Sequence, residues 1–203
     1  GLIWERGLPA FDVVYRGETF AHVSLRVPGV HNVKNALAAA AASIALGVPA
    51  RAVEEGLNAF RGAGRRLEHK GSFHGAEVFD DYAHHPGELK ALLDTARTLG
   101  YERVICAFQP HTYTPTAALF DDFAEVLKKP DVTLLAEIFA ARETNDIGIS
   151  SRDLAEQIPG AEYYATLPEV TARLRELARP GDLILTVGAG DIYTAGEALV
   201  RGE

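Results

Sequence analysis

Residues 80–86, with the sequence DDYAHHP, place two carboxylates, a tyrosine and two histidines side by side. Such a group could bind a metal ion, exchange protons with a substrate or contact a nucleotide. Adjacent histidines point in different directions in regular structure, whereas metal-binding pairs favour spacings such as i, i+4 on a helix. The pattern therefore favours hydrogen bonds to a substrate, and no metal site is predicted. One of Asp80 and Asp81 is expected to cap the helix that follows, and the other to face a ligand.

Three more polar stretches each follow an apolar run: QPHTYTPT (109–116), ARETND (141–146) and GAGD (188–191). Ligands of doubly wound α/β sheets bind at the carboxyl ends of the strands, so four such loops predict one ligand cleft. Loops between strands and helices are often polar without any ligand, and that alternative stays open. GAGD is too short for a GxGxxG motif and is better explained as a tight turn into the last helix. The chain contains no GxxxxGK[ST] phosphate loop.

The elements that must position these loops lie after residue 67. Alternation of five strands with five helices predicts βαβ units and a mostly parallel, Rossmann-like sheet. The expected strands are 76–82, 103–108, 132–139, 161–165 and 182–188, and the expected helices are 86–100, 116–127, 150–158, 168–178 and 191–200. Ser150 and Asp153 have the spacing of a capping box.

The first 62 residues predict a smaller and less complete arrangement. Residues 12–27 alternate around a turn at 16–18 and predict a β-hairpin, followed by helices at 32–46 and 50–60. The alanine-rich run at 36–48 is interpreted as a packed helix, closed by Gly47. RGAGRR, residues 61–66, is expected to form a linker or hinge. We expect an exposed apolar face in this part, covered by a partner chain or by a missing segment.

Composition narrows the class of protein. The chain has 203 residues and a formal charge of −8, which argues against a nucleic-acid binder but leaves room for an anionic ligand held by local basic groups. Its one cysteine, Cys106, lies in an apolar strand and cannot form an internal disulfide, which suggests a reducing compartment. No apolar run is long enough to cross a bilayer, so no membrane partner is predicted. The chain starts at Gly1 and has no methionine, which suggests a fragment at least as much as processing.

Six motifs together resemble the Mur ligases of peptidoglycan synthesis over essentially the whole chain. They are GVHNVKNALAAAAA (29–42), FRGAGRRLE (60–68), DDYAHHPGE (80–88), FQPHTYTPT (108–116), ARETN (141–145) and GAGDIY (188–193). The resemblance implies that residues 1–62 are the late part of a central ATPase domain. Residues 63–203 would then form the C-terminal domain, and the family's uridine-nucleotide domain and P-loop would be absent.

Within the family, the motifs are most similar to the branch that joins L-alanine to UDP-N-acetylmuramate. The resemblance implies that ATP phosphorylates the muramoyl carboxylate and that the alanine amine attacks the acyl phosphate. Mg²⁺ would bridge the phosphates and be held through the missing P-loop half. It also implies a bacterial cytoplasmic enzyme, of which this part alone should be inactive. Such chemistry needs positioning and charge neutralisation more than a protein nucleophile.

The resemblance also assigns roles to residues. His31, Asn32, Asn35, Arg66 and Asp81 would contact ATP: the first three on the adenine side, Arg66 at the phosphates and Asp81 near the ribose. Tyr82, His84, His85, His111, Thr112, Arg142 and Glu143 would line the substrate side. His84 and Arg66 would be catalytic. Arg65 is expected to be solvated, and an ion pair between Arg142 and Glu143 is weighed evenly against substrate contact.

One position departs from the family pattern. Many members carry arginine where this chain has Pro115, so a charged contact from that position is in doubt. Two alternatives remain open: a murein tripeptide recycling ligase, whose motif usually reads DDFAHHPT without the equivalent of Glu88, and a non-catalytic binding module of the same fold.

Overall fold

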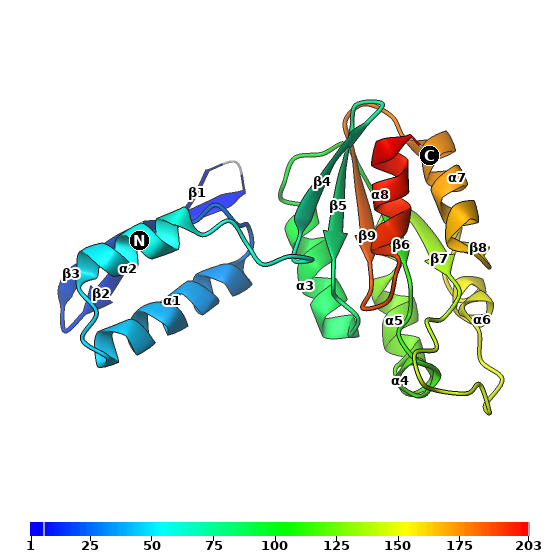
Figure 1. Cartoon of the computed structure of the whole chain (residues 1–203), viewed down its shortest axis with the longest axis horizontal. Helices are drawn as coiled ribbons and strands as arrows, with labels where there is room; N and C mark the ends of the chain where they lie inside the picture. Colours follow the sequence, from blue (N-terminus) through cyan, green and yellow to red (C-terminus); the bar gives the residue numbers. More distant parts are fainter. Residues whose placement is uncertain (6, 203) are drawn as a thin grey trace. The chain divides into compact units, whose positions relative to one another are not determined.

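The computed structural model describes residues 1–5 and 7–202, which divide into two compact units (Figure 1). Unit 1 comprises Gly1–Ala63 with Thr98–Gly100, and unit 2 comprises Gly64–Arg97 with the chain from Tyr101 onward. The division after Ala63 falls inside the RGAGRR stretch.

Unit 1 contains a three-stranded antiparallel sheet and two helices. Its elements are β1 (Ile3–Glu5), β2 (Leu8–Tyr15), β3 (Glu18–Ser24), α1 (Val30–Ala45) and α2 (Ala50–Ala59), with sheet order β1-β2-β3. The predicted hairpin is present, and its turn places Arg16 and Gly17 at φ of 52° and 87°. Positive φ at both central residues is the geometry of a type I′ turn, whose twist matches that of the strands. The short strand β1 was not predicted, since three residues carry almost no periodic signal.

Helix α1 covers one face of this sheet with a narrow stripe. Val33, Ala36 and Ala40 are its buried residues, and they join the cluster formed by the inward side chains of β2 and β3. The opposite side of the helix is exposed, including Leu37. The alanine-rich run therefore forms the expected helix, and Gly47 ends it at φ 72°, but only one of its faces is packed.

Helix α2 lies beside β3 and satisfies the backbone of that edge strand. The Glu54 carboxylate accepts a hydrogen bond from the His22 N–H at 2.9 Å. The Asn58 side chain accepts from the Ser24 N–H at 2.7 Å and donates to the His22 carbonyl at 3.2 Å. Because Glu54 and Asn58 are one helical turn apart, a single helix face provides the partners that a further strand would provide.

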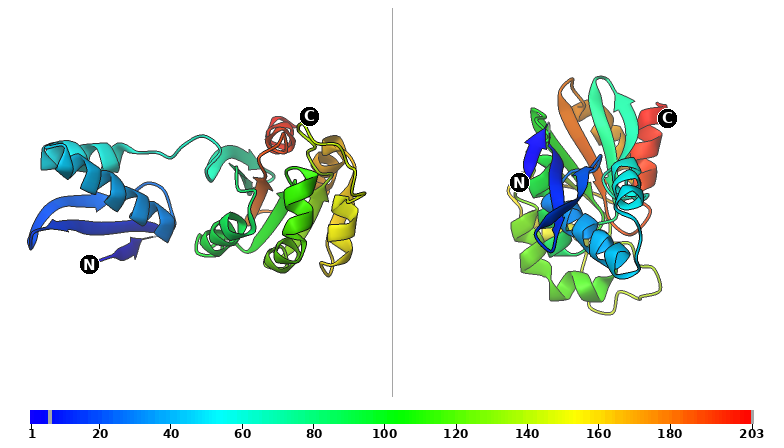
Figure 2. Two further views of the ribbon diagram at one scale, coloured as in Figure 1. Left: turned by 90° about the horizontal axis from the view of Figure 1, so that it is seen from below. Right: turned by 90° about the vertical axis from the view of Figure 1, so that its left-hand side faces the viewer.

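Unit 2 is a three-layer α/β domain built on a six-stranded sheet. Its strands are β4 (Glu68–Phe73), β5 (Ala76–Asp81), β6 (Arg103–Phe108), β7 (Val132–Ala136), β8 (Glu162–Tyr164) and β9 (Asp182–Val187). Its helices are α3 (Pro86–Ala96), α4 (Tyr113–Ala118), α5 (Phe120–Val126), α6 (Ser151–Glu156), α7 (Leu167–Leu177) and α8 (Tyr193–Arg201). Figure 2 shows α3, α5 and α6 on one face of the sheet and α7 and α8 on the other.

The strand order is β4-β5-β9-β6-β7-β8, and only β4 runs antiparallel to its neighbour. The central strand β9 is buried along its whole length and β6 along all but its first residue, as expected for a sheet covered on both faces. The mostly parallel Rossmann-like prediction is confirmed, and β9 lies between β5 and β6. Four loops therefore follow adjacent parallel strands at one edge of the sheet.

Three details of unit 2 differ from the sequence prediction. Strand β4 was not predicted because its sequence, EHKGSF, is polar and half-exposed and carries an irregularity around Gly71. The helix expected at 116–127 is divided at Leu119, whose φ and ψ are −116° and 21°. It also begins earlier, because Pro115 lies in the first turn of α4, where a missing N–H costs nothing.

Three helices of unit 2, α3, α6 and α7, begin with a capping box. The predicted capping box of Ser150 and Asp153 is confirmed at α6, and Thr166 with Glu169 forms another at α7. The Cys106 thiol lies in the core, where burial raises its pKa to about 12. No helix in the described ranges is long and apolar enough to cross a membrane.

Candidate functional site

The polar loops of unit 2 meet at the carboxyl edge of its sheet and are tied together by backbone hydrogen bonds. The Gly188 N–H donates to the carbonyl of Asp81 at 3.0 Å, which joins the loop after β9 to the end of β5. The Thr112 N–H donates to the carbonyl of Phe139 at 2.9 Å, which joins the loops after β6 and β7. The site residues predicted in unit 2 therefore lie on connected loops of one edge.

Arg65, which was expected to be solvated, is instead a half-buried anchor of this edge. Its Nε donates to the Asp80 carboxylate at 2.9 Å. Its Nη1 and Nη2 donate to the carbonyls of Gly190 and Gly188 at 3.1 and 2.6 Å. The prediction was wrong because the partners lie 15 and more than 120 residues away, so no local pattern indicates them.

Arg66 differs from Arg65 in its exposure and in its hydrogen bonds. Its side chain is exposed, and its guanidinium carbon lies 5.8 Å from the centroid of the Tyr82 ring. Within the described part of the chain, no hydrogen bond or ion pair occupies the Arg66 guanidinium. An uncommitted guanidinium is suited to bidentate contact with a phosphate or carboxylate.

The two aspartates of DDYAHHP accept hydrogen bonds from other parts of the sheet edge, and neither caps the following helix. Asp80 is fully buried, and burial raises its pKa against the opposing effect of Arg65. Asp81 accepts from the Ala83 and Leu67 N–H groups at 2.8 and 2.7 Å, and burial raises its pKa as well. The expectation that one of them caps the next helix was wrong, because His85 occupies that position.

His85 is the N-cap of α3. Its Nδ1 accepts from the Gly87 N–H at 3.2 Å, and Glu88 accepts from the N–H groups of His84 and His85 at 3.0 and 3.3 Å. A capping box of this kind needs a lone pair on the His85 ring, which a neutral imidazole provides. The backbone of the DDYAHHP loop is thus fixed at the helix start.

His84, Tyr82 and His111 form an aromatic row along the edge. The rings of Tyr82 and His84 lie 5.5 Å apart, and those of His84 and His111 lie 6.0 Å apart. The Nδ1 of His84 is 3.1 Å from the Tyr82 carbonyl, which requires a proton on Nδ1 and leaves Nε2 open. Burial and the neighbouring His84 lower the pKa of His111 below its ordinary value of 6.5.

Thr112 holds an unusual backbone conformation beside this row. It has φ 64°, a region that β-branched residues rarely occupy, and it forms the N-cap of α4 without a side-chain cap bond. Two carbonyl contacts hold it there: its N–H donates to Phe139, and its own carbonyl accepts from the Thr116 hydroxyl at 2.6 Å. Such strain persists only where the surroundings enforce it, and it is frequent at functional sites.

In the ARETND loop, Glu143 forms hydrogen bonds within the protein, whereas Arg142 is exposed. The Glu143 carboxylate accepts from the Tyr113 and Thr114 N–H groups at 2.7 and 2.9 Å, so it caps α4 from another loop. Arg142 is exposed, and no ion pair joins it to Glu143 among the residues that the structure describes. Pro115 is exposed on α4 and contributes no donor.

The GAGD stretch is a tight turn into α8, as its length suggested. Gln109 donates to Asp191 at 2.9 Å and accepts from the Ile192 N–H at 3.1 Å, which holds the turn against the loop after β6. A Cβ at Gly190 would lie 2.4 Å from the Gln109 side chain, so only glycine fits there. Roles for Gln109 and Phe139 were not predicted, because side chains that act through a distant loop leave no local signal in the sequence.

The remaining predicted residues belong to unit 1. His31, Asn32 and Asn35 lie in the first two turns of α1, where His31 and Asn35 are exposed. The Asn32 side chain donates to the Pro28 carbonyl at 2.7 Å. This leaves its amide oxygen as an acceptor.

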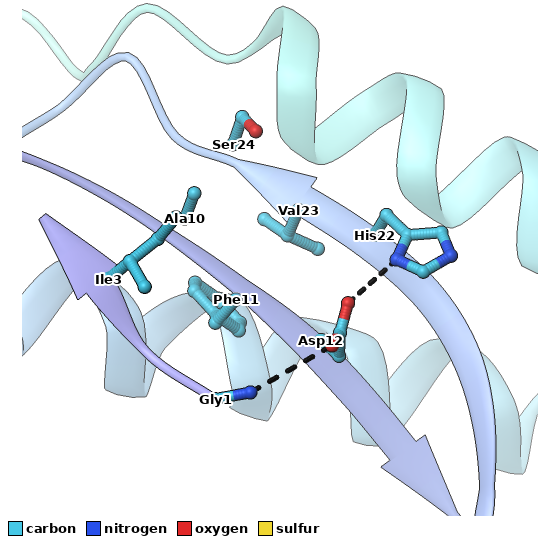
Figure 3. A pocket seen from close by; sticks show the side chains of 8 residues that line it. All are labelled: Gly1, Ile3, Ala10, Phe11, Asp12, His22, Val23 and Ser24. Carbon is cyan, nitrogen blue, oxygen red and sulfur yellow. Dashed lines mark hydrogen bonds and ion pairs between the residues drawn. The ribbon is translucent and has the colours of Figure 1, made fainter. Parts of the chain in front are cut away.

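A concave surface also lies on the unit 1 sheet (Figure 3). Its lining includes Phe11, Val23 and a close pair formed by His22 Nδ1 and the Asp12 carboxylate at 2.6 Å. None of the predicted site residues lines it. Across residues 1–5 and 7–202, no group of three or more His, Cys, Asp and Glu side chains could hold a metal ion.

Comparisons with known proteins identify the family to which this domain is similar. Residues 65–190 match the family described as Mur ligase, glutamate ligase domain. A UDP-N-acetylmuramate–L-alanine ligase of Lachnospira eligens is 45% identical over 201 residues, which are 97% of this chain and 44% of that protein. The chain thus spans less than half the length of the curated relatives it matches.

Solved structures give the same result. The UDP-N-acetylmuramate–alanine ligase of Thermotoga maritima superposes with a TM-score of 0.79 at 30% identity, over 97% of this chain and 43% of that one. A murein peptide ligase of Psychrobacter arcticus reaches 0.66 at 25% identity, over 96% and 41%. With the family match covering most of unit 2, the chain belongs to the Mur ligase family.

Proposed function

We propose that this chain supplies the carboxyl-terminal part of an ATP-dependent ligase that joins L-alanine to UDP-N-acetylmuramate in the bacterial cytoplasm. The family membership and the identity to ligases of that name support this substrate pair. Residues 1–62 would complete a nucleotide domain whose phosphate loop lies outside this sequence, and residues 63–203 would form one wall of the active site.

The observation that carries the proposal is the contrast between two adjacent arginines. The Arg65 guanidinium donates hydrogen bonds to Asp80, Gly188 and Gly190. Arg66 is exposed, and its guanidinium has no hydrogen-bond partner among the described side chains and backbone. An uncommitted cation at the edge that bears the substrate loops fits an anionic group. Arg66 would neutralise the phosphoryl oxygens as the muramoyl carboxylate becomes an acyl phosphate.

His84 is proposed to act on the incoming amine. Because its Nδ1–H points to the Tyr82 carbonyl, the Nε2 lone pair of the neutral ring is free to accept a proton. An amino acid must lose a proton from its ammonium group before the nitrogen can attack. Tyr82 and His111 flank this ring and would orient the substrate, with Thr112, His85, Arg142 and Glu143 along the same side.

ATP fits the residues proposed for it, and Mg²⁺ would be held through the ATP phosphates and the phosphate-loop part that lies outside this sequence. His31, Asn32 and Asn35 offer imidazole and amide groups for an adenine, and Asp81 has further lone pairs for a ribose hydroxyl. ATP would supply the phosphoryl group that activates the carboxylate. No cluster in the described ranges is suited to Mg²⁺, so no step is assigned to that ion through these residues.

Ligation by the longer protein that the proposal implies is the direct test. It should consume ATP and UDP-N-acetylmuramate with L-alanine, and Arg66→Ala should reduce kcat/KM by about 100-fold, the scale of losing a transition-state charge contact. The matched control is Arg61→Ala, another exposed arginine of the same stretch, which should stay within about twofold. The 203-residue chain alone should show no turnover.

The murein tripeptide ligase is the second candidate, because the Psychrobacter arcticus structure shares the fold. Faster ligation of an L-alanyl tripeptide than of L-alanine would favour it and would overturn the alanine assignment. Binding of ATP and muramate without any amide product would favour a binding module instead.

A further inference from the structure

The Arg65 side chain is partly buried and contacts several groups of unit 2. Of the five N–H donors of a guanidinium, three are used by Asp80, Gly188 and Gly190. Two aromatic rings lie against the guanidinium: its carbon is 4.9 Å from the Tyr82 centroid and 4.7 Å from the Tyr193 centroid. Such stacking is favourable for a planar cation.

The backbone of Arg65 is held as firmly as its side chain. Its N–H donates to the Glu68 carboxylate at 2.7 Å, and its carbonyl accepts from the Tyr82 N–H at 2.8 Å. Its φ is 57°, a conformation that costs free energy for a residue with a side chain. The Asp80 partner is fixed in turn by the Thr186 hydroxyl at 3.0 Å.

The Arg65 side chain links three pieces of the edge, two of which are also joined by the Gly188–Asp81 backbone hydrogen bond. Arg65 precedes β4, Tyr82 begins the substrate loop after β5, and Gly188 to Tyr193 form the turn into α8. One planar group therefore sets the separation between the Tyr82 ring and the α8 turn. Tyr82 in turn stands against His84, whose Nδ1 contacts the Tyr82 carbonyl.

We propose that Arg65 is a positioning residue for ligation, which fixes the Tyr82 ring, and through it His84, against the turn between β9 and α8. The proposal rests on the proposed function. Arg65 does not contact substrate; it holds the residues that would do so. A positioning group matters because small displacements of reacting atoms reduce rates strongly.

A purely structural ion pair is the competing explanation, and the molecule contains a matched control for it. Arg103 donates to Asp182 at 2.9 and 2.6 Å and to the Leu177 carbonyl at 2.9 Å. Its side chain is 27% exposed and its aspartate 2%, against 25% and 0% for Arg65 and Asp80. The Arg103 pair lies at the amino ends of β6 and β9, at the opposite edge of the sheet.

The test compares Arg65→Lys with Arg103→Lys. Lysine keeps the charge but cannot form the forked contacts or stack as a plane. In this chain, both variants should lower Tm by similar amounts. Only Arg65→Lys should shift the NMR signals of labelled Tyr82 and Tyr193. In the longer protein, only Arg65→Lys should lower kcat for ligation, by about 10- to 100-fold, with the KM for ATP changed less than twofold.

The outcomes separate the two claims. An active wild-type ligase in which both lysine variants keep the same kcat overturns the positioning role and leaves the proposed function intact. A wild-type protein without ligation overturns the proposed function and this inference with it. Should Arg65→Lys fail to fold, Tyr193→Leu removes one stacking face without touching the ion pair. It should lower kcat about threefold, and an unchanged kcat overturns the proposal.

Discussion

Units 1 and 2 bury their apolar side chains in different ways. In unit 2 the sheet has helices on both faces, and the members of the core cluster around Ile105, Leu134 and Ile184 are at most 1% exposed. In unit 1 the core residues retain a few per cent of their surface. Of the twelve exposed large hydrophobic side chains in the described ranges, ten lie within residues 1–63, and the others are Tyr82 and Ile147.

The difference indicates which unit contains enough structure to stand alone. A sheet covered on both faces satisfies its strands within one domain, whereas a sheet covered on one face leaves apolar surface in water. The exposed apolar surface expected for residues 1–62 is present. A second copy of the chain, or another part of the longer protein, remains our proposal for what covers this surface.

The largest difference in stability is expected when the two units are expressed as separate peptides. Residues 64–203 expressed alone should show one cooperative urea transition by far-UV circular dichroism, because every strand of their sheet is internal to them. Residues 1–63 alone should unfold at a lower urea concentration, because a domain of this size buries a smaller fraction of its apolar surface. An equal urea midpoint for the 1–63 and 64–203 peptides would contradict the difference between the units.

Paired core truncations should give the next largest effect. Leu134→Ala in unit 2 should lower the free energy of unfolding by about 3–5 kcal/mol, and Leu25→Ala in unit 1 by about 2–3 kcal/mol. Leu134 is fully buried and leaves a closed cavity, whereas Leu25 is 4% exposed and its neighbours can relax. Urea titrations that follow each unit separately would measure both, and equal losses would remove the distinction.

Lowering the pH should reduce the stability of unit 2 through protonation of His111. Its pKa is lowered in the folded protein by burial and by His84, so the unfolded chain binds the proton more readily. Stability should therefore fall as the pH drops below 6.5, and it should be recovered above that value. His111→Gln should reduce this loss between pH 7.5 and 5.5. An NMR titration of the His111 ring that gave a pKa above 6.5 would contradict it.

The smallest effect concerns the exposed surface of unit 1. Leu46 is 83% exposed, so Leu46→Glu should change the free energy of unfolding by less than about 0.5 kcal/mol. It should nevertheless reduce self-association in sedimentation experiments, because apolar surface is replaced by charge. Leu57→Glu is the control, since Leu57 packs against the unit 1 core and its substitution should destabilise.

Prediction from the sequence succeeded where the signal was local and periodic. Strands β5, β6, β7 and β9 and their helices follow from apolar runs between turn residues, and the capping box at Ser150 follows from residue spacing. Strand β4 and the division at Leu119 could not be predicted, because a polar edge strand and a broken helix have no clear period in the sequence.

The site was predictable in its location and only partly in its contacts. Parallel strands place their following loops together, so the carboxyl edge could be identified from order alone. Arg65 and Arg66 are identical in type and adjacent, yet one is enclosed and the other is exposed. That choice depends on Gly188, Gly190 and Tyr193, which the chain brings close only after the sheet has formed.

The contact between α2 and β3 also bears on aggregation. Unpaired strand edges are templates on which other chains add, and proteins use several devices to block them. Here Glu54 and Asn58 already occupy the N–H of His22 and Ser24 and the carbonyl of His22. Growth of the sheet past β3 would first have to break these bonds. A helix that imitates a strand therefore gives the smaller sheet a closed side.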